Sequence, residues 1–260
     1  MIRGSRVGVA RGHVRAVNGV SIDIADGRTL GIVGPNGSGK TSLLRALAGT
    51  LPVSGGSVAL DNRGIDSYSD RERARRIALV VQEEPGDLPL TVADSVALGR
   101  FPQQGFAAQL TSADAAIITA TLRRVDMLDF ARRRMDTLSG GERQRALIAR
   151  ALAQEATHIL LDEPTNHLDI RHAHEVLGLV ASLDVAAGIV LHDLNLAAQF
   201  CDEIAVMSEG AILASGAPDQ VLTPEILEPV YGVRVRRADI DGAITLAFRS
   251  DPARSAPGVR

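Results

Sequence analysis

The segment GPNGSGKT, residues 34–41, decides the fold and contains Lys40, the only lysine in the chain. It matches the pattern G-x-x-x-x-G-K-[ST] and stands between an apolar run, TLGIVG (29–34), and a helical pattern, TSLLRALAG (41–49). Glycines in such a segment let consecutive backbone N–H groups converge on phosphate oxygens, and the start of the next helix adds its dipole. The segment therefore predicts a phosphate-binding loop. The strand–loop–helix context disfavours the alternative, a glycine-rich turn that matches by chance.

The composition limits the class of protein. The 260 residues suffice for one large domain, or for a domain with a subdomain. A net charge of −3 and an aromatic content of 3% argue against a nucleic-acid partner. The single cysteine, Cys201, excludes an intrachain disulfide and is typical of a reducing compartment. We expect neither a membrane span nor a signal peptide, because no apolar run has the length of a span and the first 14 residues lack an apolar segment.

Short apolar runs alternate with helical patterns along most of the chain. The strand-like runs are VSIDIA (20–25), TLGIVG (29–34), THILLD (157–162), AGIVLH (187–192) and IAVMS (204–208). Helical patterns follow at 41–49, 170–183 and 193–201. This alternation predicts an α/β fold with a mainly parallel sheet.

The middle and the end of the chain differ from this pattern. Three helical segments, at 91–100, 111–125 and 142–154, follow one another without a convincing buried strand and predict an inserted α-helical subdomain. An Asp–Gly pair between two strand-like runs, VRVRRADIDGAITLAF (233–248), predicts a β-hairpin. We expect one domain over 1–249, with its core at about 1–83 and 155–223. The helical subdomain is expected at about 84–154, the hairpin region at about 224–249 and a flexible tail at 250–260.

A second candidate anion site begins at Leu138 with LSGGERQRALIARAL. Ser139, Gly140 and Gly141 stand at a predicted helix start, where unpaired N–H groups favour an anion. Since one phosphate loop already serves one nucleotide, this second site needs a different phosphate or a phosphate held by a second subunit. The alternative is a serine cap before a surface helix, which explains Ser139 but not two consecutive glycines.

Two carboxylates follow the buried run that ends in ILLDE. Asp162 stands at the carboxyl end of the predicted strand, where ligands of α/β sheets bind, and is placed to hold Mg²⁺. Glu163 is placed to accept a proton from an attacking water molecule. The alternative is a pair of surface carboxylates after a strand. It is disfavoured because the same chain also contains a phosphate-binding loop.

With these motifs together, the chain resembles the ATP-binding-cassette (ABC) ATPases over residues 5–232. The motifs that carry the resemblance occur in the family's order: GPNGSGKT, VVQ ending at Gln82, LSGGERQR, ILLDE, NHLD ending at Asp169, and His192. The resemblance implies a P-loop NTPase core with an N-terminal antiparallel β region. It implies ATP and Mg²⁺ as cofactors. It also implies a head-to-tail dimer of two copies that encloses two ATP molecules.

The resemblance assigns roles to individual residues. It implies that the phosphates are held by Gly34, Pro35, Asn36, Gly37, Ser38, Gly39, Lys40, Thr41 and Ser42. Thr41, Gln82 and Asp162 would hold Mg²⁺, Glu163 would act as general base, and His192 would contact the γ-phosphate. Contacts to ATP on the second copy would come from Ser139, Gly140, Gly141 and Glu142, with Asp169 at the dimer interface.

Two features depart from the family pattern or compete with it. Arg11 stands where the family usually has an aromatic residue that stacks on adenine; a guanidinium can stack on a base, but a neighbour could also do so. His172 and His174 raise the possibility of a metal site, which their i,i+2 spacing on a helix disfavours.

Without membrane spans, the chain resembles the separate ATPase subunit of a bacterial-type importer. The partners then implied are integral-membrane permease subunits and, indirectly, a substrate-binding protein, with the chain at the cytoplasmic face of the cell membrane. HDLNLAA (192–198) and the stretch from VLTPEIL to VYGV (221–233) resemble importers of ferric siderophores, haem and cobalamin. We favour a ferric siderophore, with haem and cobalamin as alternatives. A soluble non-transport ATPase and a regulatory ATP-binding module are the competing classes.

Overall fold

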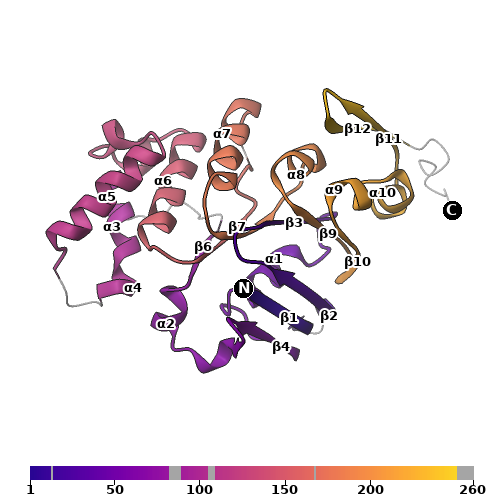
Figure 1. Ribbon diagram of the computed structural model, residues 1–260, viewed down its shortest axis with the longest axis horizontal. Helices are drawn as coiled ribbons and strands as arrows, with labels where there is room; N and C mark the ends of the chain where they lie inside the picture. The colour runs from indigo at the N-terminus through magenta and orange to yellow at the C-terminus, as the bar shows by residue number, and fades with distance from the viewer. Residues whose placement is uncertain (13, 82–88, 105–108, 167, 251–260) are drawn as a thin grey trace.

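The computed structural model describes residues 1–12, 14–81, 89–104, 109–166 and 168–250 (Figure 1). Gln82 and the expected tail after Ser250 lie outside the described residues. No helix within the described ranges is long and apolar enough to cross a membrane.

The larger sheet has six strands in the order β10-β9-β3-β8-β7-β6. Its strands are β3 (Thr29–Val33), β6 (Ile77–Val80), β7 (His158–Asp162), β8 (Ala186–Val190), β9 (Glu203–Ser208) and β10 (Ala211–Gly216). All neighbours are parallel except β9 and β10. Every residue of β3, β7 and β8 is buried, which explains why their sequences are continuous apolar runs. The predicted, mainly parallel sheet is confirmed; the short β6 and the edge strand β10 were not predicted.

A second sheet of four antiparallel strands confirms the predicted N-terminal β region. Its order is β2-β1-β4-β5, with β1 (Ile2–Arg11), β2 (Val14–Ile24), β4 (Gly55–Leu60) and β5 (Arg63–Gly64). In β2, buried Ile22 and Ile24 alternate with exposed Ser21 and Asp23. The apolar face packs with helix α1 (Lys40–Leu47) and one face of the larger sheet in a shared core.

The helical insertion lies between β6 and β7. Its α-helices are α3 (Val92–Ala97), α4 (Phe101–Gln104), α5 (Ser112–Arg124) and α6 (Gly140–Ala153). Short 3₁₀ helices join them at Leu98–Arg100, Leu128–Phe130 and Met135–Thr137. A capping box starts α5, because Thr111 and Asp114 exchange side-chain to backbone hydrogen bonds. In Figure 1 these helices gather at one side of the sheet.

The remaining helices include α7 (Ile170–Ala181) and α8 (Leu194–Phe200), which match the predicted segments. The others are α2 (Asp70–Ala74), α9 (Pro218–Val221), α10 (Pro224–Tyr231) and the 3₁₀ helix Ile65–Ser67. The hairpin indicated by the Asp–Gly pair is present as β11 (Val233–Ile240) and β12 (Ala243–Ser250). Asp241 and Gly242 form its turn with φ of 52° and 79°. The hairpin and the helical insertion lie toward opposite ends of the molecule (Figure 1).

Candidate nucleotide site

Two glycines of the phosphate loop, Gly34 and Gly39, are required by close backbone approaches. A Cβ atom on Gly34 would lie 2.2 Å from the carbonyl oxygen of Met207, and one on Gly39 would lie 2.1 Å from that of Ala16. Both glycines also have positive φ, 151° and 100°. The loop therefore turns tightly between β3 and α1, and no larger residue fits at these two positions.

Lys40 folds back over this loop. Its side chain is buried with 5% of its surface exposed, and Nζ donates hydrogen bonds to the carbonyl oxygens of Gly34 at 2.8 Å and Pro35 at 3.0 Å. Burial lowers the pKa of Lys40, while Glu163 and Asp162 oppose that shift. The ammonium group is thus satisfied by neutral carbonyls, which an anion placed in the loop can replace.

Asp162 reaches the loop from the end of β7. It is buried, and its Oδ1 accepts a hydrogen bond of 2.8 Å from Thr41 Oγ1 at the start of α1. Burial raises the pKa of Asp162, and the Thr41 hydroxyl and the Arg45 guanidinium, 3.8 Å away, work against that rise. A carboxylate and a hydroxyl side by side are the hard oxygen ligands that suit Mg²⁺.

Glu163 is held on both sides of its carboxylate. His192 Nε2 lies 2.7 Å from Glu163 Oε1, and Asn166 Nδ2 donates a hydrogen bond to Oε2. The backbone of Glu163 has a φ of 54°, which is uncommon for a residue with a side chain and fits a position under functional constraint. A hollow of about 240 Å³ is lined by Glu163 together with Ala16, Asn36, Gly37, Gly39, Lys40, Thr41 and Ser42.

Asn166 was missed by the sequence analysis. The only sequence feature that points to Asn166 is its place three residues after Glu163. In the structure, its backbone N–H donates to the carbonyl oxygen of Glu163 at 3.2 Å. This turn brings the amide to the carboxylate, a contact that a motif alone does not specify.

The segment at Ser139 is built differently from the phosphate loop. Ser139 caps α6, because its Oγ accepts from the backbone N–H of Glu142 at 3.4 Å and Glu142 Oε2 accepts from the N–H of Ser139 at 2.8 Å. The serine cap weighed as an alternative is therefore present. Gly141 also has a packing role, since a Cβ there would lie 2.8 Å from the ring of His172. Ser139 and Gly140 remain exposed, and among the described residues none of this segment lines the hollow at Glu163.

The other candidate residues are dispersed. Asp169 caps α7, with Oδ1 accepting from the backbone N–H of His172 at 2.8 Å. Arg11 is exposed at the end of β1, where it pairs with Val14. His172 lies 2.9 Å from Asp169, whereas the His174 ring meets Phe200 edge-on at 5.5 Å. The two histidines thus have separate partners, as their spacing predicts.

Comparison with known proteins gives one consistent result. Residues 17–166 match the family model for ABC transporters. The chain is 39% identical to the ferric enterobactin transport ATP-binding protein FepC of Escherichia coli, over 90% of this chain and 88% of that protein. It is 39% identical to the hemin import ATP-binding protein HmuV of Pseudomonas fluorescens, over 90% and 94%. It is 40% identical to the cobalamin import ATP-binding protein BtuD of Halobacterium salinarum, over 85% and 56%.

Solved structures agree with these relatives. The dimeric structure of MJ0796, a bacterial ABC transporter cassette, is similar with a TM-score of 0.74 and 26% identity, over 84% of this chain and 99% of that one. The ADP conformation of MJ1267, an ATP-binding cassette of an ABC transporter, gives a TM-score of 0.79 and 25% identity, over 88% and 97%.

Proposed function

Because the chain belongs to the ABC transporter family, we propose that it is the ATP-hydrolysing subunit of a ferric-siderophore importer. The family and the importer type are shown by the comparisons: the chain is an ABC ATPase, with relatives named for ferric enterobactin, hemin and cobalamin. The proposal adds the cargo, the partners and the roles of individual residues.

One observation carries the catalytic part. The phosphate loop, the Lys40 ammonium group and the Glu163 carboxylate line the same hollow. In the proposed site, the backbone from Gly34 to Ser42 binds the phosphates of ATP, and Lys40 exchanges the carbonyls of Gly34 and Pro35 for phosphate oxygens. Such an exchange suits a lysine, whose flexible stem carries a compact charge.

The chain also has a fitting donor set for Mg²⁺. Thr41 and Asp162 would hold the ion, with Gln82 as the further ligand expected from the family, and the bound ion would neutralise charge on the phosphates. Glu163, fixed between His192 and Asn166, would accept the proton of the attacking water. His192 would reach the γ-phosphate.

A second copy completes the proposed site. Ser139 and Gly140 are exposed at the start of α6, with Gly141 and Glu142 beside them, so a second chain can approach their N–H groups. A bacterial cassette with this fold has been solved as a dimer. We therefore propose a head-to-tail dimer, docked on permease subunits at the cytoplasmic face of the membrane and served indirectly by a substrate-binding protein.

The cargo is tested by uptake. Cells that lack the gene for this chain should lose uptake of iron from ferric siderophores, and the wild-type gene should restore it while Glu163→Gln should not. Loss of haem or cobalamin uptake instead would change the proposed cargo, and the assignment of the chain as an importer ATPase would stand. Normal uptake of all three, with no permease copurifying with the chain, would favour a soluble non-transport ATPase.

A further inference from the structure

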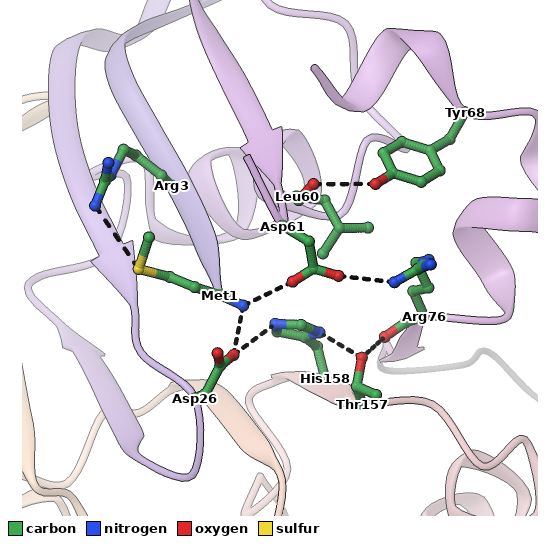
Figure 2. Close-up of polar contacts among 9 residues, drawn as sticks. All are labelled: Met1, Arg3, Asp26, Leu60, Asp61, Tyr68, Arg76, Thr157 and His158. Carbon is green, nitrogen blue, oxygen red and sulfur yellow. Dashed lines mark hydrogen bonds and ion pairs between the residues drawn. The ribbon is translucent and has the colours of Figure 1, made fainter. Parts of the chain in front are cut away.

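Three side chains of types that can bind metals lie together away from the phosphate loop. Asp26, Asp61 and His158 place one ligand atom each within 4.8 Å of one another (Figure 2). Asp26 precedes β3 and His158 begins β7, whereas the phosphate loop follows β3 and Asp162 ends β7. Since β3 and β7 both run parallel to β8, their amino ends lie on one side of the sheet and their carboxyl ends on the other. The Asp26–Asp61–His158 cluster lies at the amino ends, and the nucleotide site lies at the carboxyl ends.

The His158 ring is oriented by its neighbour. Thr157 Oγ1 donates to the carbonyl oxygen of Arg76 at 3.3 Å and lies 2.9 Å from His158 Nδ1 (Figure 2). With the hydroxyl proton donated to Arg76, the hydroxyl oxygen can accept from Nδ1–H, and this tautomer has its lone pair on Nε2. A hydrogen bond of this kind on the second ring nitrogen is typical of histidines that bind metals.

The Nε2 atom of His158 is buried and has no hydrogen-bond partner among the described residues. The His158 side chain is only 1% exposed, and its Nε2 faces Asp26 Oδ1 at 3.5 Å. A lone pair directed at a carboxylate oxygen is unfavourable unless a proton or a cation lies between them.

The carboxylates are arranged to receive positive charge. Arg76 Nη1 holds Asp61 Oδ2 at 2.8 Å, so Asp61 Oδ1 is left for the centre of the cluster. The α-ammonium group of Met1 lies there, 2.9 Å from Asp61 Oδ1 and hydrogen-bonded to Asp26 Oδ1 (Figure 2). The position therefore already accommodates a singly charged cation, yet that cation leaves Nε2 of His158 without a partner.

We propose that Asp26, Asp61 and His158 bind a divalent transition-metal ion of the Zn²⁺ class, which displaces the ammonium group of Met1. One imidazole nitrogen and two carboxylate oxygens are ligands that Zn²⁺ accepts, and a divalent ion interacts with both carboxylates more strongly than an ammonium group does. The ion would link the two sheets, because Asp61 follows β4 of the antiparallel sheet and His158 belongs to the parallel sheet. This role is structural and does not depend on the proposed function.

Zinc titration of the nucleotide-free protein tests the proposal. Isothermal titration calorimetry should show one Zn²⁺ bound per chain, and Asp26→Asn and His158→Gln should each weaken binding by about tenfold or more. Asp26 has 76% of its side chain exposed, so its variant should fold even if the His158 variant does not. His174→Gln and Asp162→Asn are matched controls that should retain zinc affinity. Zinc should raise the Tm of the wild type by more than that of Asp26→Asn.

Three results would overturn the proposal. Folded wild-type protein that binds no zinc would do so, as would equal zinc affinity in wild type and both cluster variants. Loss of zinc binding in Asp162→Asn but not in Asp26→Asn would assign the ion to the nucleotide site. Co²⁺ gives an independent reading, since the visible spectrum of the bound ion should change in Asp26→Asn and not in His174→Gln.

Discussion

At the scale of single residues, the need for a lysine at position 40 follows from the shape of the loop. The chain contains 28 lysines and arginines together, and only this one is a lysine. Its side chain is buried against the phosphate loop, which packs closely on neighbouring backbone at Gly34 and Gly39. A compact ammonium group on a slim stem fits this space, whereas a planar guanidinium is larger and prefers bidentate pairing from outside.

Lys40→Arg should therefore lose ATPase activity although the charge is kept. We expect kcat to fall by about 100-fold or more, as when one preorganised donor to a developing anion is removed. Steady-state phosphate release measures this, and Arg71→Lys, an exposed exchange in the opposite sense, should leave the rate unchanged. Wild-type turnover in Lys40→Arg would contradict this account of the loop.

Glu163→Gln should separate binding from hydrolysis. The amide cannot accept the proton of water, so turnover should nearly vanish while ATP still binds and holds two copies together. Phosphate release and light scattering with ATP present measure the two effects. Glu209→Gln is a matched control, because Glu209 also has a positive φ, 49°, but lies in the turn between β9 and β10. Normal hydrolysis in Glu163→Gln would remove Glu163 from the base role.

At the scale of elements, Asp114 joins two parts of the helical insertion. It caps α5 through Thr111 and accepts a hydrogen bond of 2.9 Å from the buried Arg100. Arg100 also binds the carbonyl oxygen of Ala153 at the end of α6, at 2.6 Å. A single carboxylate thus ties the start of one helix to the end of another.

This arrangement predicts a pH dependence of stability. The hydrogen bond from Thr111, followed by that from Arg100, lowers the pKa of Asp114 from 3.8 to about 2. A lowered pKa stabilises the folded state fully above pH 3.8, and this contribution is lost as the pH falls toward 2. Urea unfolding between these limits should show less pH dependence in Asp114→Asn than in wild type.

The C-terminal hairpin is fastened by one side chain of α8. Asn195 Oδ1 accepts from the backbone N–H of Leu246 at 2.7 Å, and Nδ2 donates to the carbonyl oxygen of Leu246 at 3.2 Å. Asn195→Ala should lower the free energy of unfolding by about 1–3 kcal/mol, from two part-buried hydrogen bonds. Urea unfolding and faster proteolysis of the hairpin measure the effect. The exposed neighbour Gln199→Ala should be neutral, and an equal loss in both variants would argue against the fastening.

At the scale of the whole molecule, the proposed site belongs to two chains. Among the described residues, Ser139 does not line the hollow at the phosphate loop, so in the proposed site a second copy brings both to one ATP. Effects of changes at Ser139 should therefore appear only on assembly.

Ser139→Arg should block hydrolysis without weakening ATP binding to the monomer. A mixture with Lys40→Ala gives a sharper test, because a mixed dimer would contain one site with both defects and one intact site. The mixture should recover part of the activity that each variant lacks alone, measured as phosphate release. Weak ATP binding by monomeric Ser139→Arg, or no recovery on mixing, would contradict the shared site.

Much of this molecule follows from local sequence. The phosphate loop needs glycines and a lysine in one short segment, buried parallel strands need continuous apolar runs, and a helix start needs its cap. Each requirement involves neighbours in the chain, so residues 34–41 and the run ending at Asp162 could be identified from the sequence. The positions of Ser139 and Asp162 in their elements also follow from such patterns.

Other features depend on contacts between distant segments. Only the tertiary structure places Asp26, Asp61 and His158 together, because they come from two turns and a strand end in different sheets and no periodicity links them. The same holds for the packing of His172 against Gly141, which gives that glycine a structural reason beside the functional one. The sequence alone therefore determined the phosphate loop and the alternation of its main buried strands and helices, since local sterics and burial dictate them. Only folding decided which side chains meet, since loop geometry and packing bring them within reach.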